Sequence, residues 1–189
     1  YKDAATRGLA MLGTIDTALS SALTLVDRAK SLAVQLSNDS YNAVEREGAA
    51  VEVEMMKDRL KEIANTDFHG RYIFGGMNYV SVPFDNTYAY SGGTSDALMY
   101  VSEVSTVEVG FNGDAVFNGN GALAGNVNIF TALDDLETAL VANDVDSVRD
   151  AIDDFDDAFS QIDVYRTKTG MSQRISMDMQ ELSESFEID

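Results

Sequence analysis

The sequence predicts an α+β protein, an elongated antiparallel helical bundle or rod with a small inserted β domain. Two observations predict this fold class. In the first and last thirds of the chain, apolar residues recur at alternating spacings of three and four, the heptad pattern of helices that pack lengthwise. Between them, residues 67–129 hold ten of the 14 glycines and short runs of period two, which favour strands and turns. The rod is therefore expected from 1–66 plus 130–189, with 67–129 as the inserted outer domain.

The first third predicts two helices. One is expected over 3–37, where the apolar positions are Ala5, Gly8, Leu12, Ile15, Leu19, Ala22, Val26, Ala29, Ala33 and Leu36. Asn38, Asp39 and Ser40 should end it and offer an N-cap oxygen to a second helix over 41–65. The apolar positions of that helix are Ala49, Val53, Met56, Leu60 and Ile63. Because the connection is short, the two helices should form an antiparallel hairpin.

The middle of the chain changes to a strand pattern. Residues 71–74 should form a strand that ends at Gly75 and Gly76, and Val107, Val109 and Phe111 alternate as in a half-buried strand. Residues 88–90 and 99–101 are weaker strand candidates. Residues 112–114 look like a turn into 115–117, and Pro83 is expected in a loop or edge segment.

The last third returns to the helical period. A short helix should begin near Ile129 and carry Leu133, Leu136 and Leu140, and a break at Asn143 and Asp144 should precede a long helix. The apolar positions of the long helix are Val148, Ile152, Phe155, Phe159 and Ile162, followed beyond Gly170 by Met171, Ile175, Leu182 and Phe186. The residues expected in the core of the rod are Leu19, Val26, Val53, Leu60, Ile152, Phe155, Phe159 and Ile162.

Composition excludes several classes of partner. Among 189 residues, 32 are acidic and 13 are basic, which gives a net charge of −19. Such a field repels nucleic acid and anionic membrane surfaces. Residues 130–165 hold eleven acids and one Arg, so they form either a solvated helix face or a docking face for a basic partner.

The sequence carries no targeting or membrane signal that we can identify. No apolar run approaches the roughly 20 residues of a membrane span, and no signal peptide is present at the start. The absence of cysteine excludes disulfides and a thiol nucleophile. Because the first residue is Tyr1 and the helical period is already established there, we expect that the natural N-terminus is missing.

No reaction centre is visible in the sequence. Asp153, Asp156 and Asp157 share one helix face, but a calcium site needs six to eight oxygens from a shaped loop. His69 has no patterned partner for catalysis, and residues 119–121 are too short for a phosphate-binding motif. The methionines are expected to pack between helices. We therefore predict no catalytic residue, cofactor or metal, and no enzyme.

The segment after the second helix carries the most specific pattern. It reads Ala64-Asn65-Thr66-Asp67-Phe68-His69-Gly70-Arg71-Tyr72-Ile73-Phe74-Gly75-Gly76, and Val82-Pro83-Phe84-Asp85 follows. Two further strings are Gly113-Asp114-Ala115-Val116-Phe117 and Ile129-Phe130-Thr131-Ala132-Leu133, and near the end come Arg166, Gly170 and Arg174. In this order the strings resemble the hook-associated protein 3 family of bacterial flagellar hook-filament junction proteins, over nearly the whole chain. Flagellin is the related alternative. Its turn after the second helix usually reads Phe-Asn-Gly, whereas this chain has Tyr72-Ile73-Phe74-Gly75-Gly76.

The resemblance implies a structural role and a set of motif residues. The motif residues are Asn65, Thr66, Gly70, Tyr72, Ile73, Phe74, Gly75, Gly76, Pro83, Phe84, Arg166, Gly170 and Arg174. Members of the family are exported through the flagellar apparatus without a cleaved signal and form a ring between hook and filament, outside the cell. The implied partners are other copies, the neighbouring hook-associated protein, subunits on the filament and cap side, and an export chaperone bound through the missing terminus. A filament subunit, and less readily an enzyme or adhesin, are the alternative functions.

Overall fold

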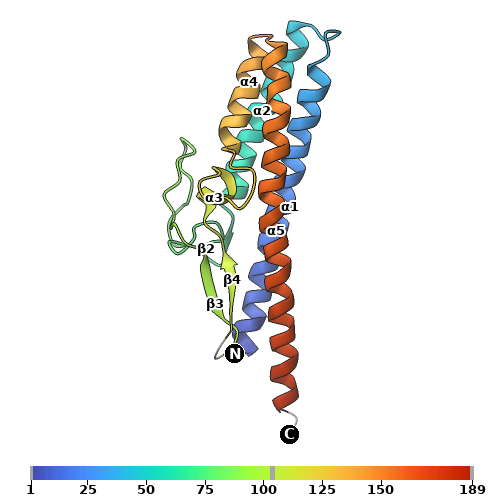
Figure 1. The fold of residues 1–189 in the computed structure, drawn as a ribbon. Coiled ribbons are helices and arrows are strands. Elements are labelled where there is room, and N and C mark those ends of the chain that lie inside the picture. Colours follow the sequence, from blue (N-terminus) through green and yellow to red (C-terminus); the bar gives the residue numbers. More distant parts are fainter. Residues whose placement is uncertain (1, 103–104, 188–189) are drawn as a thin grey trace.

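In the computed structural model, which describes residues 2–102 and 105–187, the chain is a long helical rod with a β-rich module at its side (Figure 1). The elements in chain order are α1 (Lys2–Leu36), α2 (Ala43–Ala64), β1 (Asp67–Phe68), β2 (Arg71–Tyr72), β3 (Ala97–Tyr100), β4 (Thr106–Gly110), α3 (Gly113–Phe117), α4 (Ile129–Val141) and α5 (Val145–Glu187). The predicted class, mostly helical with small antiparallel sheets, is confirmed.

Helices α1 and α5 run antiparallel along the length of the rod, and both described chain ends lie at the same end of it (Figure 1). Every apolar position predicted for α1, from Ala5 to Leu36, is buried. Contrary to the sequence reading, α1 is long and apolar enough to cross a membrane by length and composition alone. Its apolar stripe is instead buried in the core that the helices share, which accounts for its composition.

Helices α2 and α4 pack against each other and complete a four-helix bundle over the half of the rod away from the chain ends (Figure 1). The N-cap of α2 is Asn42, and not a residue of 38–40 as predicted. Asn42 Oδ1 accepts from the Glu45 backbone N–H at 3.0 Å, and Glu45 Oε2 accepts from the Asn42 N–H at 2.8 Å. This reciprocal pair is a capping box, so the turn between the helices is longer than expected.

The β-rich module lies beside the half of the rod that carries the chain ends. It contains two antiparallel pairs, β1 with β2 and β3 with β4. Val107, Val109 and Phe111 are buried as predicted. The predicted turn at 112–114 instead begins α3, since Asn112 Oδ1 caps the Asp114 N–H at 3.0 Å. The strand expected over 71–74 is shorter, and residues 84 and 90 form only an isolated bridge.

The inward face of α5 differs from the predicted one. Phe155 and Ile162 are buried, but Phe159 is 41% exposed and Ile152 is only half-buried. Ala151 and Ala158 occupy the buried positions in their place. Beyond Gly170 the buried positions are Ser172 and Ser176, whereas Met171, Ile175 and Leu182 are exposed. The side chain of Phe186 lies outside the described residues.

Candidate functional site

The segment that follows α2 folds into a tight hairpin. Residues His69 and Gly70 connect β1 to β2, with φ of +52° and +80°. Positive φ at both central positions is the signature of a type I′ turn, whose twist matches the paired strands and which glycine adopts without strain. Asp67 accepts from the Gly70 N–H at 2.9 Å. His69, which the sequence gives no catalytic partner, is therefore a turn residue in the structure.

Asn65 fastens this hairpin to the loop that contains Pro83. Its Nδ2 donates to the Phe84 carbonyl at 2.8 Å, and its Oδ1 accepts from the Phe84 N–H at 2.9 Å. Thr66 accepts from the Ile73 N–H at 3.1 Å, and Pro83 accepts from the Ser91 N–H at 2.8 Å. The side-chain amide of Asn65 and the backbone carbonyl of Thr66 therefore connect the end of α2 to both the Pro83 loop and the β1–β2 hairpin.

The glycine pair Gly75 and Gly76 permits two backbones to approach. A Cβ on Gly75 would lie 2.8 Å from the Asn78 carbonyl oxygen, and a Cβ on Gly76, where φ is +57°, would lie 2.5 Å from that of Gly93. Both distances are shorter than side chains tolerate. Only glycine fits here, so the loop of 77–93 can fold back over the hairpin.

Behind the glycines lies a cluster of aromatic rings. Phe74, Phe84, Phe117, Phe130, Tyr88 and Tyr90 form it, with ring centroids 4.9–6.5 Å apart. Tyr90 donates to the carbonyls of Phe74 and Gly93 at 3.2 and 2.9 Å. Burial raises the pKa of Tyr90 to about 12. Because T-shaped and stacked rings add stability beyond area burial, this cluster is a packing centre that joins the β module to α4.

Three predicted motif residues lie apart from this centre. Arg166, Gly170 and Arg174 follow one exposed stripe of α5 at intervals of four. Arg166 pairs with Asp16 of α1 at 3.0 Å. A Cβ on Gly170 would meet nothing within 4 Å, and no contact among the described residues explains a glycine there. The structure therefore brings together the motif residues of 65–84 but not those of α5.

The acidic side chains do not form a metal site among the residues that the structure describes. Asp134 and Glu137 accept hydrogen bonds from Lys57 at 2.6 and 3.1 Å, and Asp156 pairs with Lys30. Burial lowers the pKa of Lys57, but these bonds outweigh it and raise the pKa overall. Asp154 differs, since burial and then the neighbouring carboxylates of Asp135, Asp157, Asp153 and Asp150 raise its pKa.

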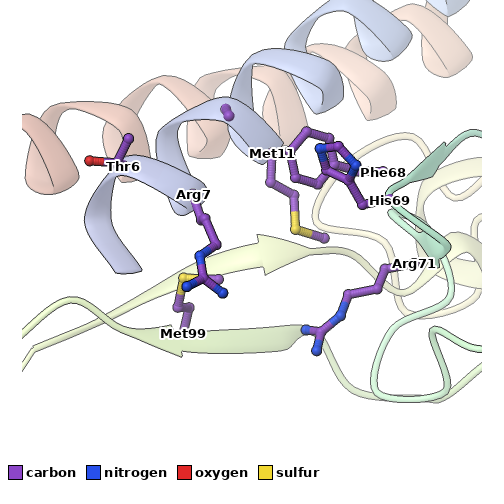
Figure 2. Close-up of a pocket in the computed structure, with 8 residues that line it drawn as sticks. Thr6, Arg7, Met11, Phe68, His69, Arg71 and Met99 are labelled. Atoms are coloured by element: carbon purple, nitrogen blue, oxygen red, sulfur yellow. The ribbon is translucent and has the colours of Figure 1, made fainter. Parts of the chain in front are cut away.

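A cavity of about 480 Å³ opens between the first turns of α1, the β1–β2 hairpin and β3 (Figure 2). Its lining residues are Thr6, Arg7, Ala10, Met11, Phe68, His69, Arg71 and Met99. Figure 2 shows Arg7 and Arg71 entering it from different elements. This cavity could not be predicted from the sequence, because it depends on residues of 6–11, 68–71 and 99, which only the fold brings together.

Two buried polar side chains were also missed. Arg46 is 3% exposed and donates to the carbonyls of Leu36 and Asn38 and to Asn143. It thereby ties both interhelical turns at one end of the rod. Gln161 donates to the carbonyls of Val116 and Val127 at 2.9 and 3.0 Å. Arg46 lies three residues before Ala49, on the apolar stripe of its helix, and a polar residue on that stripe is the signal that could have identified it. Gln161 lies off the predicted stripe of α5 and gave no such signal.

Comparison with known proteins agrees with this architecture. Residues 1–79 match the model of the bacterial flagellin N-terminal helical region. Flagellar hook-associated protein 3 of Salmonella typhimurium is 31% identical over 105 residues, 54% of this chain and 33% of that protein. The Escherichia coli protein of the same name is 29% identical over 145 residues, 71% of this chain and 46% of that protein. The chain thus spans less than half the length of these relatives.

The fold also matches a solved structure from end to end. The crystal structure of Xanthomonas campestris FlgL superposes with a TM-score of 0.86 at 18% identity, over 98% of this chain and 93% of that one. At this identity the likeness concerns the fold. Both curated relatives are flagellar hook-associated proteins, and neither name indicates an enzyme. The predicted resemblance to the hook-associated protein 3 family is confirmed, and residues 1–79 are similar to the N-terminal helical region of bacterial flagellin.

Proposed function

We propose that this chain is part of the structural subunit that joins hook to filament in the bacterial flagellum. A flagellar role is supported by both curated relatives, which are flagellar hook-associated proteins. The observation that carries the finer proposal is the rod itself, whose two longest helices pack lengthwise and end on the same side (Figure 1). Such a rod offers long faces for lateral contacts between parallel copies.

The proposed assembly is a ring of copies, outside the cell, between hook and filament. Its partners are other copies of the protein, a neighbouring hook-associated protein on the hook side and subunits on the filament and cap side. Export proceeds through the flagellar apparatus without a cleaved signal, helped by a chaperone that binds a terminal segment. All 13 motif residues are proposed to be structural: those of 65–84 hold the module at a fixed position on the rod, and Arg166, Gly170 and Arg174 lie on the exposed face of α5.

Flagellin, a filament subunit, is the second candidate. The match of residues 1–79 to the flagellin helical region favours it. The two candidates differ in copy number and position, because a junction subunit occupies one layer and a filament subunit occupies the whole filament. The names of both curated relatives favour the junction.

Deletion of the full-length gene distinguishes the two functions. Loss of a junction protein should leave hooks that carry no filament, while flagellin is still exported and collects in the medium. Expression of the intact gene should restore filaments. Loss of the major filament protein itself, with the junction intact, would instead identify the chain as flagellin.

A further inference from the structure

Eight of the 13 cations of this acidic chain form ion pairs with carboxylates of the described residues. Those in ion pairs with carboxylates are Arg28, Lys30, Lys57, Arg59, Lys61, Arg149, Arg166 and Lys168. Among the described residues, no carboxylate lies within ion-pair distance of Arg7, Arg71 or Arg174. Two of these three line the same cavity. In a chain of net charge −19, an unneutralised pair of guanidinium groups marks a site for external anionic groups.

The cavity that holds them is amphipathic. Met11, Phe68 and Met99 form its apolar wall, and none of its lining residues is acidic. Arg71 lies over the Tyr79 ring, with its guanidinium carbon 4.6 Å from the ring centroid, which orients the planar group while leaving its N–H donors available. A guanidinium pairs a carboxylate in a bidentate fork, so the cavity suits carboxylates on a helix with some apolar surface.

The chain itself presents such a helix face. Asp135, Asp150, Asp153, Asp154 and Asp157, here called the acidic ridge, make no ion pair among the described residues. Three of them, Asp135, Asp150 and Asp154, line a groove of about 350 Å³ between α4 and α5, whose other walls include Ala139, Ala142 and Ala151. Burial, and after it the neighbouring carboxylates, raise the pKa of Asp154, and no cation among the described residues forms an ion pair with the ridge.

We propose that the Arg7 and Arg71 cavity of one copy receives the acidic ridge of a second copy. The ridge gathers five carboxylates that have no ion-pair partner among the described residues, and the cavity is lined by two arginines that likewise have none. This contact is heterologous, because different surfaces meet, and it therefore repeats from copy to copy. The inference rests on the proposed function, in which copies of the rod lie side by side.

The contact has a defined geometry. Arg166 of α5 pairs with Asp16 of α1, and the two helices are antiparallel. The cavity, lined by residues 6–11 of α1, therefore lies at the level of about residue 173 of α5. Asp154 lies about 20 residues along α5 from that level. At 1.5 Å per residue, parallel copies in this contact are staggered by about 30 Å along the rod. Exposed ion pairs contribute little each, so the isolated chain should associate weakly and the contact should strengthen when a template aligns the copies.

Cross-linking between two variants tests the contact without altering its charges. Thr6 lines the basic cavity and Thr138 the acidic groove, and the chain has no native cysteine. Thr6→Cys and Thr138→Cys chains are mixed and treated with a short bismaleimide, since an Arg–Asp pair holds Cβ atoms farther apart than a disulfide allows. A mixture of Thr138→Cys with Thr167→Cys, an exposed position elsewhere on α5, serves as the control.

The mixture should give at least about fivefold more covalent dimer than the control, and 1 M salt should remove the excess because it shortens the screening length to about 3 Å. Arg7→Glu with Arg71→Glu should lower the yield to the control level. Arg59→Glu with Arg149→Glu, which changes the net charge equally, should not. Further addition of Asp150→Lys and Asp154→Lys to the Arg7 and Arg71 double variant should restore it.

A yield equal to the control, or one that the Arg7 and Arg71 reversal leaves unchanged, would overturn the proposed contact. The same substitutions in the full-length protein separate this result from the proposed function. If the unaltered full-length protein restores the junction in a deletion strain but the Thr6→Cys and Thr138→Cys pair cross-links only at the control level, the contact is wrong and the function stands. If the unaltered protein restores no junction, the proposed function is wrong whatever the cross-link shows.

Discussion

At the scale of single residues, alanines occupy much of the buried surface along α1 and α5. They include Ala22, Ala29, Ala33, Ala151 and Ala158. Small side chains let helix axes approach closely, so the larger residues beside them are displaced to the edges of the contact. This is why the prediction that Phe159 lies in the core was wrong, and why Ile152 is only half-buried. A prediction that assigns the largest apolar side chains to the core selects Ile152 and Phe159 over the neighbouring Ala151 and Ala158.

Truncation of the two phenylalanines on α5 tests the corrected assignment. Phe155 is fully buried and Phe159 is 41% exposed. Phe155→Ala should lower the free energy of unfolding by about 3–5 kcal/mol, because it leaves a cavity as well as losing buried area. Phe159→Ala makes the same chemical change at a solvated site and should cost about 1 kcal/mol or less. Equal losses in urea unfolding would mean that the inward face of α5 is misassigned.

Gly170 offers a second test at this scale. It lies inside α5, where glycine is less stable than alanine, and a Cβ there would meet nothing within 4 Å. Gly170→Ala should therefore raise the free energy of unfolding by about 0.5–1 kcal/mol. A decrease, measured by thermal unfolding, would show that the position is strained or in contact. If the stabilised variant assembles poorly in the flagellum, the glycine is needed for contact with a neighbour.

At the scale of elements, the helices could be predicted closely and their ends could not. All ten apolar positions of α1 follow from the heptad spacing, since a buried stripe requires them. The start of α2 was misplaced because 38–40 and Asn42 all carry capping side chains, and only Glu45, three residues after Asn42, completes the box. Helix α3 was mistaken for a turn, because five residues hold too little periodicity to identify a helix.

The acidic end of α5 predicts opposite pH responses for two aspartates. Burial and neighbouring carboxylates raise the pKa of Asp154 in the folded state, so its charge destabilises the fold above that pKa. Asp154→Asn should therefore raise the melting temperature at neutral pH, and the gain should vanish as pH falls below the ordinary aspartate pKa, where the carboxyl is protonated in both states.

Asp144 serves as the matched aspartate of opposite sign. It accepts from the hydroxyl and the N–H of Ser147 at 2.7 and 3.3 Å, and these bonds lower its pKa. Asp144→Ala should lower the melting temperature at neutral pH, and the loss should disappear as pH falls through the lowered pKa. Shifts of the same sign for both variants, or shifts that do not change with pH, would contradict the assigned environments.

At the scale of the whole molecule, the rod and the β module share one hydrophobic core. Buried residues form a single cluster from Met11 to Tyr165, and β4 packs against both long helices. The period of the sequence predicted where helix gives way to strand. It could not predict how the module lies on the rod, because that depends on Asn65, Gln161 and the aromatic cluster, which join segments far apart in the chain.

The proposed two-part organisation can be tested by removal of residues 67–129. The end of α2 and the start of α4 lie side by side (Figure 1), so a short linker can join them. The shortened chain should keep its helical circular dichroism and melt cooperatively, but at a lower temperature, since Phe74, Phe84 and Phe117 are lost from the core. Loss of the helical signal would mean that the rod cannot fold without the module.

The position of the protein in the flagellum is the most direct test of the account. Flagella are isolated from cells that produce the full-length protein, and the region where hook meets filament is imaged by electron cryomicroscopy. The account predicts density that fits the four-helix rod in one layer between hook and filament, with neighbouring copies side by side. Rods of this shape along the whole filament, or none at the junction, would contradict it.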